Sequence, residues 1–218
     1  KERDNLTTEI EIEKYIEEAA QKLGISSIEV EDLAVDDFKL KDHQLIYSFD
    51  DYNANLVLTG IGKSVIKWFK PDGNEQKSVP QFVKDKFAVK LKKLKAVQKQ
   101  IDQTTSAQKE RFDRMLRSNR VMKLDYFKEK YLKHELLSFC INKVIFKFSN
   151  ENDDVLAIYI NKQWIALDYS NVDIEKYDNV LLWHPVISTT NEVKEWRKFL
   201  MEGEIQQPFK QAFREIYL

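Results

Sequence analysis

The spacing of short apolar runs limits the fold of this chain more than any other feature. Three runs rich in Val, Ile, Leu and aromatic residues follow closely on one another, at 44–49, 55–59 and 65–69. Turn-forming residues separate them, and connections this short cannot carry the crossover that joins parallel strands. We therefore predict an antiparallel meander of three strands.

A second set of apolar runs lies further along the chain, at 144–148, 155–160, 163–168 and 180–183. The dipeptide Asn161-Lys162 supplies a two-residue turn between the second and third of these runs, which predicts a hairpin. From Pro80 to the start of this second set, apolar residues recur mainly at the helical spacing of three and four. The predicted fold class is α+β. Antiparallel strands in two regions, about 37–69 and 144–183, flank an inserted basic helical block, and C-terminal helices follow.

The helix boundaries are predicted from capping residues and glycines. An amphipathic helix is expected over 6–23, where Thr7 or Thr8 caps the start and Gly24 ends it. Inside the basic block, the hydroxyl-bearing residues 104–106 interrupt the apolar stripe, so we expect one helix before them and a second after them. A third helix is expected to start after Asp125.

Two more helices are expected near the end of the chain. Thr189 and Glu192 have the spacing of a capping box, which predicts a helix that ends at Gly203. Pro208 fits the first position of a closing helix. The predicted organisation is thus an N-terminal helix, 1–24, and a single α+β domain, 25–218. Because the chain opens on Lys1 rather than Met, we expect it to be a piece of a longer protein.

Composition excludes several classes of protein. With 43% hydrophobic and 12% aromatic residues, the chain can bury a core and is not expected to be disordered. It has no apolar run of membrane-spanning length and no signal peptide, so we expect no membrane partner. A single cysteine, Cys140, excludes an internal disulfide framework and fits a cytoplasmic location. Its apolar neighbours Phe139 and Ile141 favour a buried thiol over a nucleophile.

The net charge of −1 conceals a strong asymmetry. Residues 1–60 carry a net charge of −9, whereas residues 84–133 carry +10. The basic block is the kind of feature that can bind nucleic acid. The same charge asymmetry equally fits an electrostatic attraction between two regions of one domain, or lysine-rich helix faces that are exposed to water. The absence of arginine from 84–99 favours the last two interpretations.

The chain lacks the common motifs of catalysis and cofactor binding. Gly60-Ile61-Gly62-Lys63 has half of a phosphate-binding loop and no more. The three histidines, His43, His134 and His184, do not have the spacing of a zinc site. We therefore predict no cofactor, no metal and no catalytic residue.

The most informative stretch is a cluster of planar polar and aromatic residues toward the C-terminus. Its members are His184, Trp196, Gln207, Phe209, Gln211 and Arg214. The guanidinium of Arg214 could bind a phosphate, or it could pair with a carboxylate such as Glu204 or Glu215 within the fold, which we favour. We also expect four rings to dock the C-terminal helices on the sheet: Trp196, Phe199, Phe209 and Phe213.

The same residues resemble a known family. The motifs Leu182-Trp183-His184-Pro185 and Glu195-Trp196-Arg197, with the closing Gln-Pro-Phe-Lys-Gln-Ala-Phe-Arg-Glu-Ile-Tyr of 207–217, resemble the bacterial MolR-like family, domain of unknown function 4132. The similarity extends over about residues 30–217. It implies a long multidomain bacterial protein, and some members lie beside a WGR domain, a module associated with nucleic acid. The resemblance supplies no catalytic residues.

Three functions follow as hypotheses. The first is a noncatalytic interaction or scaffold module of a larger bacterial protein, whose partners are other domains of the same polypeptide or another protein. The second is a nucleic-acid-associated regulatory domain, for which we expect only weak binding. The third is an enzyme whose site is assembled around Arg214, Gln211 and His184.

Overall fold

The computed structural model describes residues 2–215, and the side chains of residues 11–215. Contacts divide the chain into two compact units, 1–36 and 37–218. The domain boundary predicted after residue 24 stays a prediction. Among the described residues, no helix combines the length and the apolarity needed to cross a bilayer.

The first unit consists of two helices, α1 (Glu2–Leu23) and α2 (Ser27–Leu33). The predicted first helix is confirmed, and Gly24 ends it with a φ of +65°. Its start was predicted too late, because no glycine or proline before Leu6 stops the helix from extending. The second helix was not predicted. The hydroxyl of Ser26 accepts from the backbone of Glu29, whose carboxylate accepts from the backbone of Ser26, which makes a capping box.

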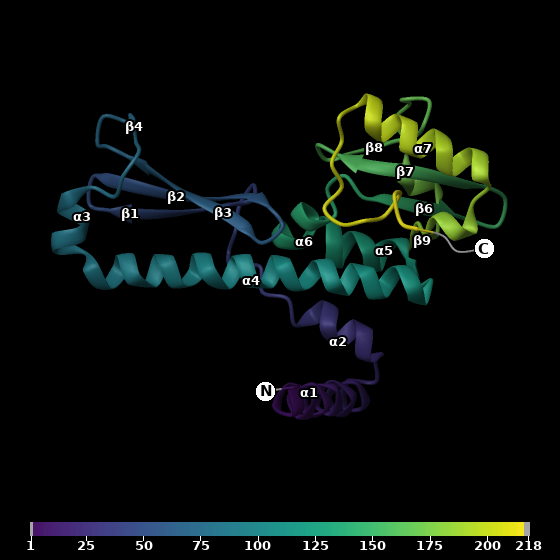
Figure 1. The fold of residues 1–218 in the computed structure, drawn as a ribbon, viewed down its shortest axis with the longest axis horizontal. Coiled ribbons are helices and arrows are strands. Elements are labelled where there is room, and N and C mark those ends of the chain that lie inside the picture. The colour runs from purple at the N-terminus through teal and green to yellow at the C-terminus, as the bar shows by residue number, and fades with distance from the viewer. Residues whose placement is uncertain (1, 216–218) are drawn as a thin grey trace. The chain divides into compact units, whose positions relative to one another are not determined.

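The first sheet of the second unit is the predicted meander with one short strand added. Its antiparallel strands lie in chain order: β1 (Gln44–Phe49), β2 (Tyr52–Gly60), β3 (Lys63–Phe69) and β4 (Glu75–Gln76). One face packs on α3 (Gln81–Lys86) and on the first half of α4 (Ala88–Ser118) (Figure 1). The ring of Phe49 is fully buried there, 5.4 Å from Trp68 and 5.8 Å from Phe87 between ring centroids.

Helix α4 runs without interruption through the residues that were expected to break it. The prediction of two helices separated at 104–106 is therefore wrong. The hydroxyl of Thr105 donates to the carbonyl of Ile101, one turn earlier, so it is satisfied inside the helix. The same oxygen accepts from the backbone N–H of Gly62, 2.9 Å away, at the tip of the β2–β3 hairpin. Thr105 thus links the first sheet to α4 and does not cap a second helix.

Short helical elements follow α4. They are α5 (Leu124–Phe127), a π-helical turn (Lys128–Leu132) and α6 (Glu135–Cys140). The helix expected after Asp125 is present and starts one residue earlier, at Leu124. A three-residue strand that was not predicted, β5 (Val121–Lys123), comes directly before it.

The second sheet is also antiparallel and has the order β5-β9-β6-β7-β8. Its other strands are β6 (Ile145–Ser149), β7 (Asp154–Ile160), β8 (Gln163–Ile165) and β9 (Asn179–Leu182). The predicted β7–β8 hairpin is confirmed, and Asn161 and Lys162 both have positive φ values. Strand β8 was predicted to reach residue 168. It ends earlier because the carboxylate of Asp168 accepts from the backbone of Ser170 in a tight turn.

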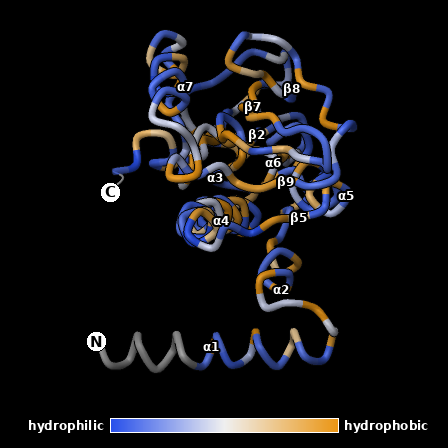
Figure 2. The backbone as a smooth tube through the Cα atoms, turned by 90° about the vertical axis from the view of Figure 1, so that its right-hand side faces the viewer, coloured by the Kyte–Doolittle hydropathy of each residue, from blue (hydrophilic) through white to orange (hydrophobic). Residues whose placement is uncertain are grey.

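Strand β6 is covered on both faces, so the core of this part has two layers. The side chain of Ile145 joins Trp183 and Trp196 under α7 (Thr190–Glu202), which starts at the predicted cap Thr189. On the opposite face, Phe146 lies 5.0 Å from Phe127 between ring centroids. The strands of this sheet carry hydrophobic residues, whereas the coloured part of α1 is largely hydrophilic (Figure 2). The predicted α+β class is confirmed.

The link between Thr105 and Gly62 can be tested with a substitution that keeps the side-chain shape. Thr105→Val removes the acceptor and leaves the N–H of Gly62 partly buried without it, so we expect a loss of about 1–3 kcal/mol in the free energy of unfolding. The control is Thr104→Val, which makes the same change at a neighbouring position. Urea titration of both variants measures the effect. Equal losses in the two variants would show that the general effect of replacing a hydroxyl by a methyl group in this helix, and not the bond to Gly62, matters.

Candidate functional site

Four of the predicted site residues lie close together in sequence near the end of the chain: Gln207, Phe209, Gln211 and Arg214. We call this stretch the C-terminal segment (206–215). The closing helix expected from Pro208 is not formed. In a helix, the N–H of Ala212 would donate to the carbonyl of Pro208. Here it donates instead to the side-chain oxygen of Gln207, at 3.0 Å, and the segment folds as turns.

The side chain of Gln211 attaches this segment to the second sheet. It is fully buried, and its oxygen accepts from the backbone N–H of Ile145 at 2.9 Å. Its nitrogen donates to the carbonyls of Ile145 and Trp183, at 2.7 and 2.8 Å. A fourth bond, from the side-chain nitrogen of Gln207, completes the set. Both donors and both acceptor positions of the carboxamide are used, and it bridges the backbone of Ile145 to that of Trp183, at the ends of the neighbouring strands β6 and β9.

Two arginines hold the far end of the C-terminal segment. Arg197 of α7 donates from Nε to the carbonyl of Ala212 at 2.8 Å and from a terminal nitrogen to the carbonyl of Arg214. Arg214 pairs with the carboxylate of Asp113 on α4. The expected carboxylate pairing of Arg214 therefore occurs, and the carboxylate is that of Asp113. The sequence separation of 101 residues hid this partner.

The aromatic anchors of the cluster behave differently from one another. Trp196, Phe199 and Phe209 are buried, and Phe209 stacks on Phe112 of α4 with 5.7 Å between ring centroids. Phe213 is 42% exposed, so its predicted role as an anchor is wrong. The expectation rested on a helix that would place it on the same face as Phe209, and that helix is not formed.

His184 also has a local structural role. Its Nδ1 accepts from the backbone N–H of Val186 at 3.0 Å and so caps the short 3-10 turn Pro185–Ile187. Burial lowers the pKa of the imidazole, which favours the neutral form that this acceptor role needs.

The cavity that contains Gln211 does not bring together the residues of the enzyme hypothesis. A cavity of about 560 Å³ beneath the C-terminal segment is lined by Gln207 and Gln211. Among the residues that the structure describes, its lining includes neither Arg214 nor His184. All hydrogen-bonding positions of the Gln211 side chain are in any case occupied by its bonds to Ile145, Trp183 and Gln207. Cys140 is fully buried as predicted, and burial raises the pKa of its thiol.

One serine–histidine contact was missed by the sequence analysis. Nε2 of His43 lies 3.2 Å from Oγ of Ser138. The carboxylate of Glu135 accepts from the backbone N–H of His43, which is not the contact to the ring that a catalytic triad requires. Ser138 is only 7% exposed and also bonds within its own helix, to the carbonyl of Glu135. This group joins the start of β1 to α6. Sequence separations of more than ninety residues left no signal for it.

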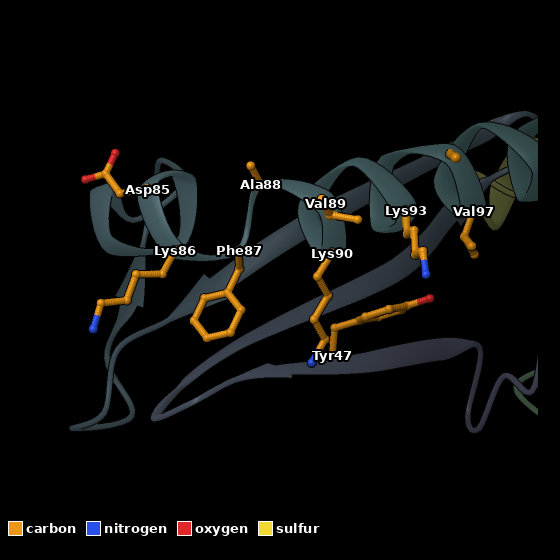
Figure 3. A pocket seen from close by; sticks show the side chains of 10 residues that line it. Tyr47, Asp85, Lys86, Phe87, Ala88, Val89, Lys90, Lys93 and Val97 are labelled. Atoms are coloured by element: carbon orange, nitrogen blue, oxygen red, sulfur yellow. The ribbon is translucent and has the colours of Figure 1, made fainter.

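A groove of about 840 Å³ lies at the other end of the unit, between α3–α4 and β1. We call it the lysine groove. Its apolar and aromatic lining residues are Tyr47, Phe87, Ala88, Val89, Ala96 and Val97, and three lysines line it too: Lys86, Lys90 and Lys93. Figure 3 shows Phe87, Lys90 and Lys93 pointing from the helix toward the strand that carries Tyr47.

The charges of the lysine groove are only partly compensated. Asp85 also lines it, but its carboxylate accepts from the side chain of Gln81 and points away from the strand (Figure 3). The ammonium of Lys90 donates to the backbone carbonyl of Ser48 and lies 5.1 Å from the centroid of the Phe49 ring. The sequence showed these lysines as part of a basic block. It did not show that an aromatic strand residue, Tyr47, lies opposite them.

Fold and contacts define an α+β domain in which glutamine and arginine side chains hold the C-terminal segment to the second sheet and to α4, and in which lysines line a groove at the other end. A model of the family described as Domain of unknown function (DUF4132) matches residues 73–218. The chain therefore belongs to this family. The match contains the second sheet and the C-terminal segment, and it begins after β3. No curated protein and no solved structure matches the chain.

The role of Gln211 leads to a stability prediction. Gln211→Leu keeps the bulk of the side chain but leaves the backbone groups of Ile145 and the carbonyl of Trp183 without this partner. Each such buried group costs about 1–3 kcal/mol, so we expect the free energy of unfolding to fall by at least about 2 kcal/mol. The exposed Gln206→Leu is the control and should change stability little. A fall of less than about 0.5 kcal/mol in the urea midpoint analysis would contradict the assignment.

The aromatic anchors can be tested with two phenylalanines of the same segment. Phe209→Ala removes a buried ring and should cost about 3–5 kcal/mol, as should Trp196→Ala. Phe213→Ala removes an exposed ring and should cost much less. Thermal melts of the three variants separate these outcomes. Wild-type midpoints for Trp196→Ala and Phe209→Ala would mean that the cluster serves binding and not stability.

Proposed function

We propose that this chain is a noncatalytic interaction domain that binds an acidic segment of a protein through the lysine groove. The observation that carries the proposal is that apolar and aromatic residues and three lysines line the same groove. Such a site favours an acidic ligand, whose carboxylates pair with the lysines and whose side-chain methylene groups cover the apolar residues. Val89, which lines the groove, is 72% exposed, so a partner has apolar surface to cover.

The electrostatic setting of the groove supports this choice of partner. It lies at the start of the region 84–133, which carries a net charge of +10. A positive surface speeds the encounter with an acidic partner and selects against basic ones. Lysine ammonium groups act as flexible point charges, which fits carboxylates presented along a chain better than it fits a bidentate site for one phosphate. The partner is another domain of the same polypeptide or a separate protein.

The bonding of the C-terminal cluster argues against an enzyme in that region. Gln211 and Arg214 are committed to backbone and carboxylate partners, and His184 caps a turn. We also propose that the protein is MolR-like, bacterial and cytoplasmic, on the strength of the motifs of 182–185 and 207–217.

The proposal is tested with a labelled probe peptide of alternating glutamate and valine, ten residues long. Fluorescence anisotropy at about 0.15 M salt should show saturable binding. Combined charge reversal by Lys86→Glu, Lys90→Glu and Lys93→Glu should weaken it at least about tenfold. The matched control is Lys92→Glu, Lys95→Glu and Lys99→Glu, which makes the same charge change on α4 outside the groove and should weaken binding far less.

Two outcomes would contradict this function. Equal losses in both triple variants would show that net charge alone attracts the probe. Binding of a 20-base-pair duplex or a single-stranded RNA tighter than about micromolar at the same salt, lost on reversal of the groove lysines, would favour the nucleic-acid alternative. Thermal melts of each variant establish that it is folded.

A further inference from the structure

The lysine groove lies beside a free sheet edge. In the order β1-β2-β3-β4, strand β1 pairs with β2 on one side and is an edge strand on the other. Backbone groups of alternate residues in an antiparallel edge strand point away from the partner strand. The carbonyl of Ser48 points away from β2, because it accepts from Lys90 of α4. By the same alternation, the N–H and the carbonyl of Ile46 point away from β2 as well.

This free edge is short and exposed. At its start, Gln44 exchanges two backbone hydrogen bonds with Lys41, which closes the edge there. Ile46 and Ser48 remain, and the side chain of Ile46 is 59% exposed. Native proteins commonly protect edge strands with lysine side chains. The bond from Lys90 to Ser48 protects this one while leaving the groups of Ile46 available.

We propose that the acidic segment binds as an extended strand added to the edge of β1. This inference rests on the proposed function and specifies the conformation of the bound segment. Main-chain hydrogen bonds to Ile46 and Ser48 would supply affinity that does not depend on sequence. The arriving strand displaces Lys90 from the carbonyl of Ser48, and its ammonium then pairs with a carboxylate of the ligand. Lys90 therefore changes partners within the same groove.

The pleat of the added strand dictates its side-chain pattern. Side chains of a strand alternate between the two faces of the sheet. Tyr47 lies on the face that looks toward α4, so ligand side chains on that face meet the lysines (Figure 3). Those on the other face lie next to Ile46. The preferred segment thus alternates acidic and aliphatic residues, which is the pattern of the probe peptide.

A second copy of this chain is a poorer occupant of the edge. Pairing two β1 edges would bring the lysines of both grooves together, and like charges in such a contact oppose association. An acidic segment neutralises the positive charge of the groove lysines, whereas a second copy would add an equal positive charge.

Peptide N-methylation tests the backbone pairing directly. Two versions of the probe are made, one methylated on every valine nitrogen and the other on every glutamate nitrogen. In an antiparallel addition, the residues bonded to Ile46 and Ser48 have side chains on the face of Ile46, so methylated valines should weaken binding about tenfold or more and methylated glutamates should not. A parallel addition reverses the two results. Equal binding of both versions would overturn strand addition.

A substitution in the protein gives an independent readout. Ile46→Pro removes the N–H at the free edge, a position where an edge strand tolerates proline, and should weaken the unmethylated probe about tenfold. Ile46→Val keeps the N–H and is the control. If the proline variant melts far below wild type, hydrogen exchange replaces it as the readout: the amide of Ile46 in the wild-type protein should become protected when the probe binds. An unprotected amide in the saturated complex would overturn the proposal.

The outcomes separate this inference from the function on which it rests. Binding that depends on the groove lysines, but not on the methylation pattern or on Ile46, would sustain the interaction function and overturn strand addition. Absence of any binding of the probe would overturn both. Self-association that is lost in Ile46→Pro would assign the edge to a second copy and also overturn the inference.

Discussion

A single helix, α4, fixes the positions of both sheets in the second unit. Around Asp102 and Thr105 it bonds to Ser64 and to the tip of the β2–β3 hairpin. About two turns after Thr105, Phe112 stacks on Phe209, and Asp113 pairs with Arg214. Because a hydrogen-bonded helix is stiff, these two sets of contacts cannot shift independently. The continuity of α4 through Thr105 is thus a condition for the geometry of the lysine groove at one end and of the C-terminal segment at the other.

Much of the fold could be predicted because local patterns carry it. The β1–β2–β3 meander, the turn at Asn161-Lys162 and the cap at Thr189 each depend on a few adjacent residues. The errors arose where hydrogen bonds to particular side chains, and not the helix-forming pattern, decide the local structure. In sequence, Thr105 fits a helix start, but in the structure its hydroxyl accepts from the N–H of Gly62. Pro208 also fits a helix start, but the side chain of Gln207 accepts from the N–H of Ala212, which a helix would use.

The candidate sites show the same limit. The cluster near the end of the chain was recognised by its residue types, but its role was not. In the sequence alone, Gln211 and Arg214 look like ligand-binding residues, whereas in the structure Gln211 bonds to the backbone of the second sheet and Arg214 pairs with Asp113. The lysines of the groove were visible as charge. Their relation to Tyr47 and to the edge of β1 depends on contacts across some forty residues, for which one sequence carries no signal.

The bonds of Gln211 also bear on the order in which this chain can be completed during synthesis. Its partner Ile145 precedes it by 66 residues, and the Asp113–Arg214 pair spans 101. Contacts of such separation form late, because closing a long loop costs chain entropy before the contact returns any stability. While a ribosome still holds the end of this region, the amide of Ile145 and the carbonyl of Trp183 lack their carboxamide partner. The nascent domain therefore acquires its final stability only after residue 214 has left the exit tunnel.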